Sequence, residues 1–217
     1  PTPAPKPEPE PKPADTKPSE TKPAETKPAE AKPAETKPTD TAAEPDPYTT
    51  PANPTLEKVD ITLGGRVFHL EQALTAVQRY HGLSGRTEIA EDGGMIFAFK
   101  HAQVMQFVMR DCPADIDIIF VNQNSRITAM HHMAAGPVRT EAQKKLYPPY
   151  PNAPKSEWLN REYEDLLKKY SSRYDACIVI ELKGGTLKLN DADKGTLVLK
   201  NNDDLKLDVK GLQEKAE

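Results

Sequence analysis

The sequence predicts a mainly β (β-rich α+β) domain, a small compact barrel or sandwich with one or two short helices. A disordered, proline-rich tether is expected before it. Three observations predict this arrangement. Short apolar runs recur from residue 59 onward, several of them joined by paired glycines, as in β-hairpins. The run "IIFV" at 118–121 is apolar throughout, which favours a strand buried on both faces. Residues 1–54 hold 16 of the 22 prolines and no Cys, Met, Trp, Phe, Leu, Ile or Val.

Residues 1–54 are expected to stay disordered, because they cannot bury enough apolar surface to offset chain entropy. From Ala14 the chain repeats in units of five residues such as "AETKP". Such units have no apolar face to stack, so they indicate a spacer rather than a solenoid. Extended at about 3.1 Å per residue, this segment would reach on the order of 170 Å. The composition resembles the Pro-Lys and Glu-Pro linkers of Gram-negative envelope proteins. A spacer that holds a domain away from a membrane anchor is therefore expected, with an inert tail as the alternative.

Residues 55–210 are predicted to form a single domain, followed by a flexible tail at 211–217. The domain starts with a hairpin, because 59–63 and 66–70 alternate around Gly64-Gly65. Residues 74–80 predict a short helix that ends at Gly82.

The middle of the domain predicts four more strands. "MIFAFK" at 95–100 follows a glycine pair, and a second strand is expected at 104–109. Residues 116–122 contain the continuous apolar run, which places this strand inside a sheet. After a polar turn, 126–133 is expected to return beside it.

The last third of the domain begins with five prolines within 134–155, which predict an irregular loop. Residues 156–170 predict the one convincing helix, with Ser156 as N-cap and apolar residues along one face. The remaining strands are expected at "CIVIEL" (177–182), at "GTLVLK" (195–200) and, along an edge, at 205–209.

Charge and composition exclude several classes of function. The first 54 residues carry seven Lys against ten Asp or Glu, whereas the rest has 22 basic and 23 acidic groups. This near-neutral balance gives no electrostatic footprint for nucleic acid. A membrane contact is expected only through the tether or a removed leader. Neither a G-x-S-x-G elbow nor a Walker or dinucleotide loop is present. We expect no cofactor and a monomer.

Four motifs in order carry a resemblance to a known family: "GLSGR" (82–86), "GGMIFAF" (93–99), "FVMRDCPADIDIIFVN" (107–122) and "IVIELKGG" (178–185). Together they resemble the bacterial family called domain of unknown function 192, over about residues 59–200. The resemblance implies a small β-rich, barrel-like domain and export from the cytoplasm, without an established activity. Ser84 stands where the family has Met, and Val108 where it has Trp. Residues 134–173 resemble an insertion.

A polar knot at 110–117 is the first candidate site. Asp117 directly precedes the apolar run, and a buried carboxylate needs partners. Arg86, Arg110 and backbone N–H groups of the turn are the candidates. Asp117 is then either a structural tie or a ligand-binding or general-base carboxylate in a pocket lined by Phe107 and Met109.

Glu181 is the second candidate carboxylate. Strand alternation places it opposite to Ile180 and Leu182, where solvent exposure is expected. If it instead shared a cavity with Asp117, the pair would suit acid/base hydrolysis of a glycosidic bond.

Two further groups of residues have alternative interpretations. Cys112 and Cys177 are the only cysteines, and they predict either a disulfide in an oxidising compartment or unpaired core thiols. Thioether and imidazole groups in "MHHM" (130–133) suit copper. Because strand neighbours point to opposite faces, only Met130 with His132, or His131 with Met133, would converge. His101 or Met109 would then have to supply a further copper ligand. The alternative is a strand with two Met in the core and two exposed His.

These observations leave three hypotheses about function. The first is an exported, tethered binding or accessory module of the cell envelope, whose partner is a small ligand or an envelope protein. The second is a hydrolase of an envelope polymer that uses Asp117 with a second acid or a His. The third is a copper-handling protein that uses residues 130–133.

Overall fold

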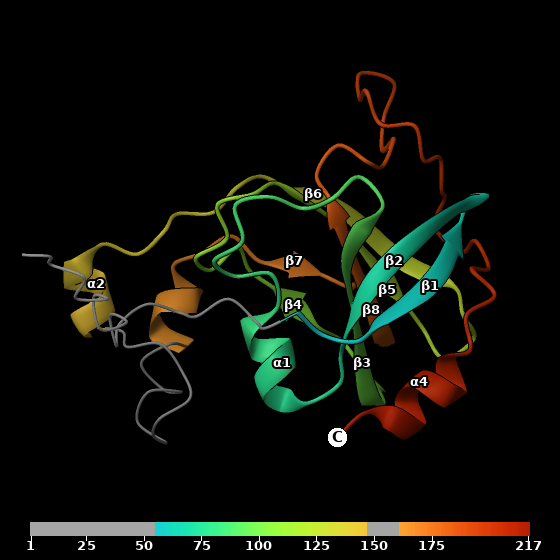
Figure 1. The fold of residues 1–217 in the computed structure, drawn as a ribbon, viewed down its shortest axis with the longest axis horizontal. Coiled ribbons are helices and arrows are strands. Elements are labelled where there is room, and N and C mark those ends of the chain that lie inside the picture. The colour runs from blue at the N-terminus through green and yellow to red at the C-terminus, as the bar shows by residue number, and fades with distance from the viewer. Residues whose placement is uncertain (1–54, 147–160) are drawn as a thin grey trace, which may run out of the picture. The chain divides into compact units, whose positions relative to one another are not determined.

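The computed structural model describes residues 55–146 and 161–217 (Figure 1). The predicted tether lies outside the described residues. The strands are β1 (Lys58–Leu63), β2 (Arg66–Ala73), β3 (Gly93–Gln103), β4 (Gln106–Phe107), β5 (Ile116–Val121), β6 (Ile127–Met133), β7 (Tyr170–Ser171) and β8 (Ala176–Lys183). The helices with assigned bounds are α1 (Ala76–His81), α2 (Glu141–Leu146) and α4 (Val209–Lys215). The prediction of a mainly β domain with few short helices is confirmed.

Six strands form one mixed sheet in the order β1-β2-β3-β8-β5-β6, and β4 pairs with β7 in a second, two-stranded sheet. Only the β2–β3 pair of the large sheet is parallel. β8 lies between β3 and β5, although it is the last strand in the chain. Within the described residues no ladder joins β1 to β6, so the sheet is open and does not close into a barrel.

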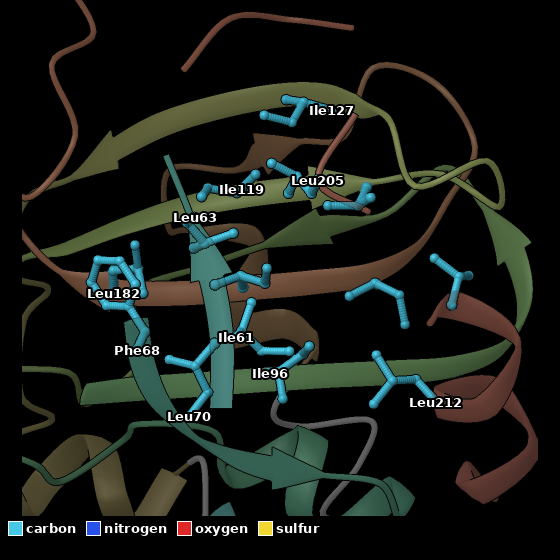
Figure 2. Packing of buried hydrophobic residues seen from close by; sticks show 14 of the residues in the cluster. Ile61, Leu63, Phe68, Leu70, Ile96, Ile119, Ile127, Leu182, Leu205 and Leu212 are labelled. Carbon is cyan, nitrogen blue, oxygen red and sulfur yellow. The ribbon is translucent and has the colours of Figure 1, made fainter. Parts of the chain in front are cut away.

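Both faces of the large sheet carry a hydrophobic core. One core joins side chains of β1 and β2 to alternate residues of β3, β5 and β8 and to the C-terminal segment, including Leu205 and Leu212 (Figure 2). The other core joins Met95, Phe97 and Ile118 to residues of the segment that precedes β5. Burial on both faces explains the apolar run in β5, whose six residues are all buried.

Glycines allow two close backbone geometries in the sheet. Gly64 and Gly65 both have positive φ (53° and 83°) and join β1 to β2 as the expected hairpin. Gly94 has φ 146°, and a Cβ atom there would lie 2.1 Å from the carbonyl oxygen of Glu181. The close approach of β3 to β8 therefore depends on a glycine at 94.

Gly94→Ala is expected to lower the free energy of unfolding by about 2–3 kcal/mol more than Gly185→Ala. Both glycines have positive φ, but nothing lies within 4 Å of a Cβ built at Gly185. Gly185→Ala therefore tests the backbone strain alone, and Gly94→Ala adds the overlap with β8. Urea unfolding of the two variants measures the difference, and equal losses would contradict the steric explanation.

Three elements that were predicted between residues 104 and 170 differ from the structure. The strand at 104–109 reduces to the two residues of β4. The loop expected over 134–155 contains α2. The helix expected over 156–170 is helical at 161–165, and Tyr170 belongs to β7. Residues 147–160 lie outside the described residues.

The C-terminal region was predicted wrongly in three respects. Residues 195–200 form no strand, and only an isolated bridge joins Leu197 to Leu187. The expected edge strand at 205–209 is absent, because α4 begins at Val209 with Asp208 as its N-cap. Residues 211–215 of the expected tail belong to this helix, and Leu212 and Ala216 are buried in the first core. None of the helices in the described ranges has the length and apolar character that a bilayer crossing requires.

Candidate functional site

A cavity of about 490 Å³ lies on the second face of the large sheet. Its walls come from α1 and the following turn, from β3 and the segment up to the polar knot, and from β8. The apolar lining includes Leu83, Phe97, Phe99, Met105, Phe107, Met109 and Ile116. The polar lining includes Arg79, His81, Ser84, Arg110, Cys112, Glu164 and Glu181. Its volume is in the range of sites for small organic ligands.

Glu181 is the buried acid of this cavity, and Glu164 is a second acid that is only partly buried. It lies on β8, opposite Met95 of β3 and Ile118 of β5, and it is only 6 % exposed. Neither a hydrogen bond nor an ion pair joins its carboxyl group to any described residue. Burial raises the pKa of Glu181 to about 8, because desolvation disfavours the charged form. The expected alternation is confirmed, but the expected exposure to solvent is wrong.

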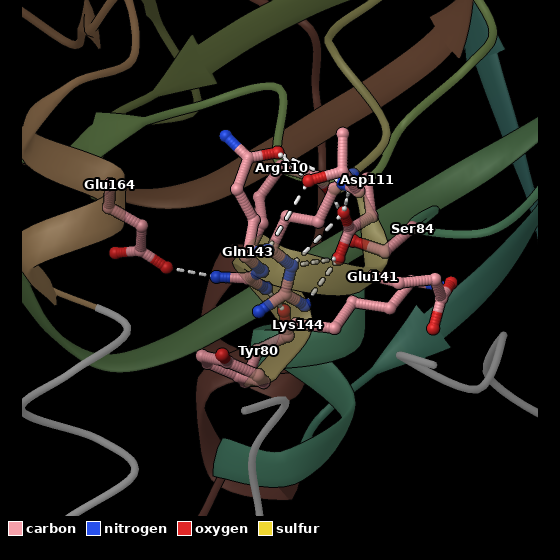
Figure 3. Close-up of polar contacts among 10 residues, drawn as sticks. Tyr80, Ser84, Arg110, Asp111, Glu141, Gln143, Lys144 and Glu164 are labelled. Carbon is pink, nitrogen blue, oxygen red and sulfur yellow. Dashed lines mark hydrogen bonds and ion pairs between the residues drawn. The ribbon is translucent and has the colours of Figure 1, made fainter. Parts of the chain in front are cut away.

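The two guanidinium groups of the cavity have partners within the protein. Arg110 donates to the carbonyl of Tyr80, forms an ion pair with Glu164 and stacks 3.8 Å from the centre of the Tyr80 ring (Figure 3). Ser84 Oγ donates to the Arg110 carbonyl at 2.9 Å. These contacts connect the end of α1 with the knot and with the segment after residue 160.

Arg79 reaches across the other side of the cavity. Its Nη1 donates to the carbonyls of Leu74 and Ala98, and its Nη2 donates to the Glu217 carbonyl. The guanidinium carbon lies 5.0 Å from the centre of the Phe99 ring. Both cations are thus held by protein groups, whereas Glu181 is not.

His81 lies at the end of α1 and is buried, and its Nδ1 has no hydrogen-bond partner in the described part of the chain. Burial, followed by the charge of Arg110, lowers the pKa of His81. This imidazole is therefore neutral at pH 7 and adds no positive charge to the cavity.

The polar knot is tied to the segment that follows β6. Asp111, with φ 50°, accepts hydrogen bonds from the backbone N–H of Arg139 at 3.0 Å and from its Nε at 2.9 Å. Asp115 Oδ1 accepts from the Ala135 N–H at 2.6 Å. The knot therefore anchors residues 135–139, and its backbone delivers Arg110 and Cys112 to the cavity wall.

Asp117 does not belong to the cavity. It lies on the opposite face of β5 from Ile118, where Oδ1 contacts His132 Nδ1 at 2.8 Å. Its Oδ2 accepts from the Leu187 N–H at 2.7 Å. Arg86 and Arg110 were predicted as partners of Asp117, and this prediction is wrong. Because Asp117 and Glu181 face opposite sides of the sheet, the pairing proposed for glycoside hydrolysis is wrong as well.

Arg86 pairs with Glu71, a contact that the sequence analysis did not anticipate. Its two terminal nitrogens lie 2.6 and 2.7 Å from the two carboxylate oxygens. Hydrogen bonding to Arg86 and to the Leu56 N–H outweighs burial and lowers the pKa of Glu71. Of the predicted pocket residues, Phe107, Met109 and Arg110 line the cavity, whereas Arg86 and Asp117 do not.

Of the two interpretations of the cysteines, the unpaired core thiols are confirmed and the disulfide is wrong. Cys112 and Cys177 are both free and buried, and they belong to different cores. Burial, with a smaller effect of the Glu181 charge, raises the pKa of Cys112 to about 12. Burial raises the pKa of Cys177 to about 11.

Reductant is therefore expected to leave the unfolding temperature unchanged. A thiol reagent at neutral pH should modify neither cysteine until the chain unfolds, because buried thiols with raised pKa values supply almost no thiolate. Counting reacted thiols with and without denaturant measures this. Loss of thiol signal in the denatured, unreduced protein would instead indicate a bridge.

The "MHHM" residues are split between the two faces of β6. His131 packs between the rings of Phe120 and Tyr170, and its Nε2 lies 2.8 Å from the Ser171 carbonyl. His132 contacts Asp117 on the other face. Met133 is buried in the second core and His101 is exposed. Across 55–146 and 161–217, no three His, Cys, Asp or Glu residues are grouped as metal ligands.

Comparison with known proteins identifies the family. Residues 59–199 match the model of the domain of unknown function 192 family, described as an uncharacterised group. The chain belongs to this family. No molecular function is established for the domain of unknown function 192 family. Except for Lys58, the matched region contains the strands β1 to β8, and it contains the whole cavity wall, including Glu181.

Two solved structures are similar to this member of the domain of unknown function 192 family. A proposed transcription regulator from Sinorhizobium meliloti is 23 % identical, with a TM-score of 0.39, and the match covers 58 % of this chain and 78 % of that one. A protein of unknown function from Novosphingobium aromaticivorans is 25 % identical, with a TM-score of 0.44, and the match covers 62 % and 81 %. No curated protein matches the sequence.

Proposed function

We propose that this chain is a tethered ligand-binding module of the bacterial cell envelope, with the Glu181 cavity as its binding site. One observation carries the proposal: the carboxyl group of a buried residue, Glu181, faces a cavity of ligand size and forms no hydrogen bond or ion pair with the described chain. A buried polar group without a partner costs free energy. Such a group is retained more readily where a bound molecule supplies the partner.

The composition of the cavity wall supports a role in ligand binding rather than a packing defect. Its apolar part is aromatic and sulfur-rich, with Phe107 packed edge-on against Phe97 and Phe99 at 5.5 and 6.5 Å between ring centres. Gln103, Val104 and Gln106 line the cavity and are exposed, so they mark its mouth. A mostly apolar wall with a few placed polar groups is the usual composition of a small-molecule site.

Blocking the mouth tests this proposal. Gln106→Trp places a large side chain at the rim, and Gln123→Trp makes the same change at an exposed position outside the cavity lining. A mixture of small apolar amines, alcohols and acids is screened against the full chain by ligand-observed NMR. We expect compounds that bind the wild type and Gln123→Trp but not Gln106→Trp. Equal binding to all three proteins, or no binding to any, would overturn the proposal.

The envelope location rests on the N-terminal composition. Residues 1–54 combine proline, lysine and glutamate in short repeats, which suit a solvated spacer between an anchor and a domain. We infer that the module works as a monomer and meets a small ligand or an envelope protein outside the cytoplasm. Fractionation of the producing cells should recover the chain with the envelope or periplasm, and recovery in the cytosol would contradict this part.

A further inference from the structure

We propose that the ligand of the Glu181 cavity is an organic ammonium ion, a positively charged nitrogen on an apolar body. This inference rests on the proposed function and specifies the chemistry of the same site. Three features of the cavity support it: its charge balance, the aromatic rings that line it, and the position of Glu181 between two apolar strands.

Glu181 is the unbalanced charge among the described cavity residues. Arg110 pairs with Glu164, and Arg79 is held by three carbonyl groups and lies near the charge of Glu217. An ionised Glu181 would have no counter-ion in this cavity. A ligand cation would supply one, whereas a ligand anion would add a second unpaired charge of the same sign.

The aromatic lining favours the same class of ligand. The rings of Phe97, Phe99 and Phe107 border the cavity, and the faces of aromatic rings attract cations, more strongly so when both partners are desolvated. The rest of the apolar lining is aliphatic or thioether, which suits an apolar body attached to the charged nitrogen. An alkyl or arylalkyl ammonium ion satisfies both requirements.

Among the groups that face this part of the cavity, Glu181 is the one whose protonation is expected to control ligand binding. β3 and β5 contribute Met95 and Ile118, which do not titrate. The knot contributes Cys112, and burial raises its pKa to about 12, so the thiol stays neutral. α1 contributes Arg79 and the neutral His81, and the remaining charged groups of the wall, Arg110 and Glu164, pair with each other.

Proton release follows from this arrangement. Because the pKa of Glu181 is raised to about 8 in the empty cavity, the group is a neutral acid at pH 7. Binding a cation makes the carboxylate the favoured form, so one proton leaves Glu181 for solvent as the ligand enters. Affinity should therefore rise with pH up to about 8 and level off above it.

Three ligands of matched size test the inference: phenethylamine, phenethyl alcohol and hydrocinnamate. They are titrated into the full chain by calorimetry at pH about 6 and about 9, in buffers of different ionisation enthalpy, which reports proton release. We expect the amine to bind best. Its affinity should be about a hundredfold weaker at the lower pH, and close to one proton should be released per bound amine there.

Two variants identify the group responsible. Glu181→Gln keeps the shape of the side chain and removes its charge, so it should lose the preference for the amine, the pH dependence and the proton release while it still binds the alcohol. Glu88→Gln, an exposed acid outside the cavity lining, should behave as the wild type. A preference for the amine that survives in Glu181→Gln would overturn the inference.

The outcomes also separate the inference from the proposed function. If the alcohol binds as tightly as the amine and Gln106→Trp blocks both, the cavity is a ligand site and the cation inference is wrong. The same conclusion follows if the acid binds best. If none of the three ligands binds, the inference is again wrong, and the rim-blocking screen alone then decides the proposed function.

Discussion

Arg139→Met is expected to lower the free energy of unfolding by about 3–5 kcal/mol, because it removes a guanidinium group that pairs with the buried Asp111 carboxylate. The Arg139 side chain is fully buried and that of Asp111 is 9 % exposed. The Arg139 guanidinium donates hydrogen bonds to both carboxylate oxygens of Asp111. The guanidinium also lies 5.4 Å from the centre of the Tyr163 ring, so its loss affects the packing of the segment after residue 160.

Urea unfolding measures this loss of stability. Two further variants show whether the loss comes from the buried ion pair. Lys169→Met removes a partner from the exposed pair with Asp165 and should cost less than about 1 kcal/mol. The double variant Asp111→Asn, Arg139→Met should recover part of the stability, because it removes both charges of the buried pair together. A loss for Arg139→Met no larger than that for Lys169→Met would show that the pair does not hold the knot.

Glu181→Gln is expected to stabilise the protein at pH 8 and above by up to about 5 kcal/mol. The folded chain holds the Glu181 proton up to about pH 8, whereas the ordinary value of the pKa is 4.5. Between these values the unfolded chain has already lost the proton that the folded chain keeps. Stability from this group is therefore fully present below pH 4.5 and falls as the pH rises towards 8.

The measurement is the difference in unfolding free energy between Glu181→Gln and the wild type across this pH range. The difference should grow by about 1.4 kcal/mol per pH unit and level off above about 8, since glutamine carries no titrating proton. Glu88→Gln should show no such slope. Parallel curves for the wild type and Glu181→Gln would mean that Glu181 ionises freely in the cavity.

Short-range sequence patterns predicted much of the large sheet, but they did not predict the segments that pack on its two faces. The Gly64-Gly65 hairpin and the buried β5 could be predicted, because turn geometry and burial on both faces leave short-range patterns. The helix α4 was missed, because Gly211 weakens its pattern. Its Asp208 cap and the spacing of Val209, Leu212 and Ala216 nevertheless indicate a helix.

The candidate site could be predicted only in part. Strand alternation correctly placed Glu181 opposite to Ile180 and Leu182, and Val179 on the side of Glu181 already indicated an apolar surface there. The loops that bury this side come from 82–84 and 103–112, far from β8 in sequence. Arg139 lies in the segment predicted as a proline-rich loop, and no local pattern marks it, because its partner Asp111 lies 28 residues earlier.

The central place of β8 has a consequence for how the chain acquires its fold during synthesis. β3 and β5 each pair with β8 and not with each other, so both present unpaired edges until residue 183 has left the ribosome. Exposed strand edges promote association between chains. A nascent chain must therefore keep β3 and β5 apart until the last strand arrives. The same event that completes the sheet brings Glu181 into the cavity, so partly synthesised chains have neither a finished sheet nor a binding site.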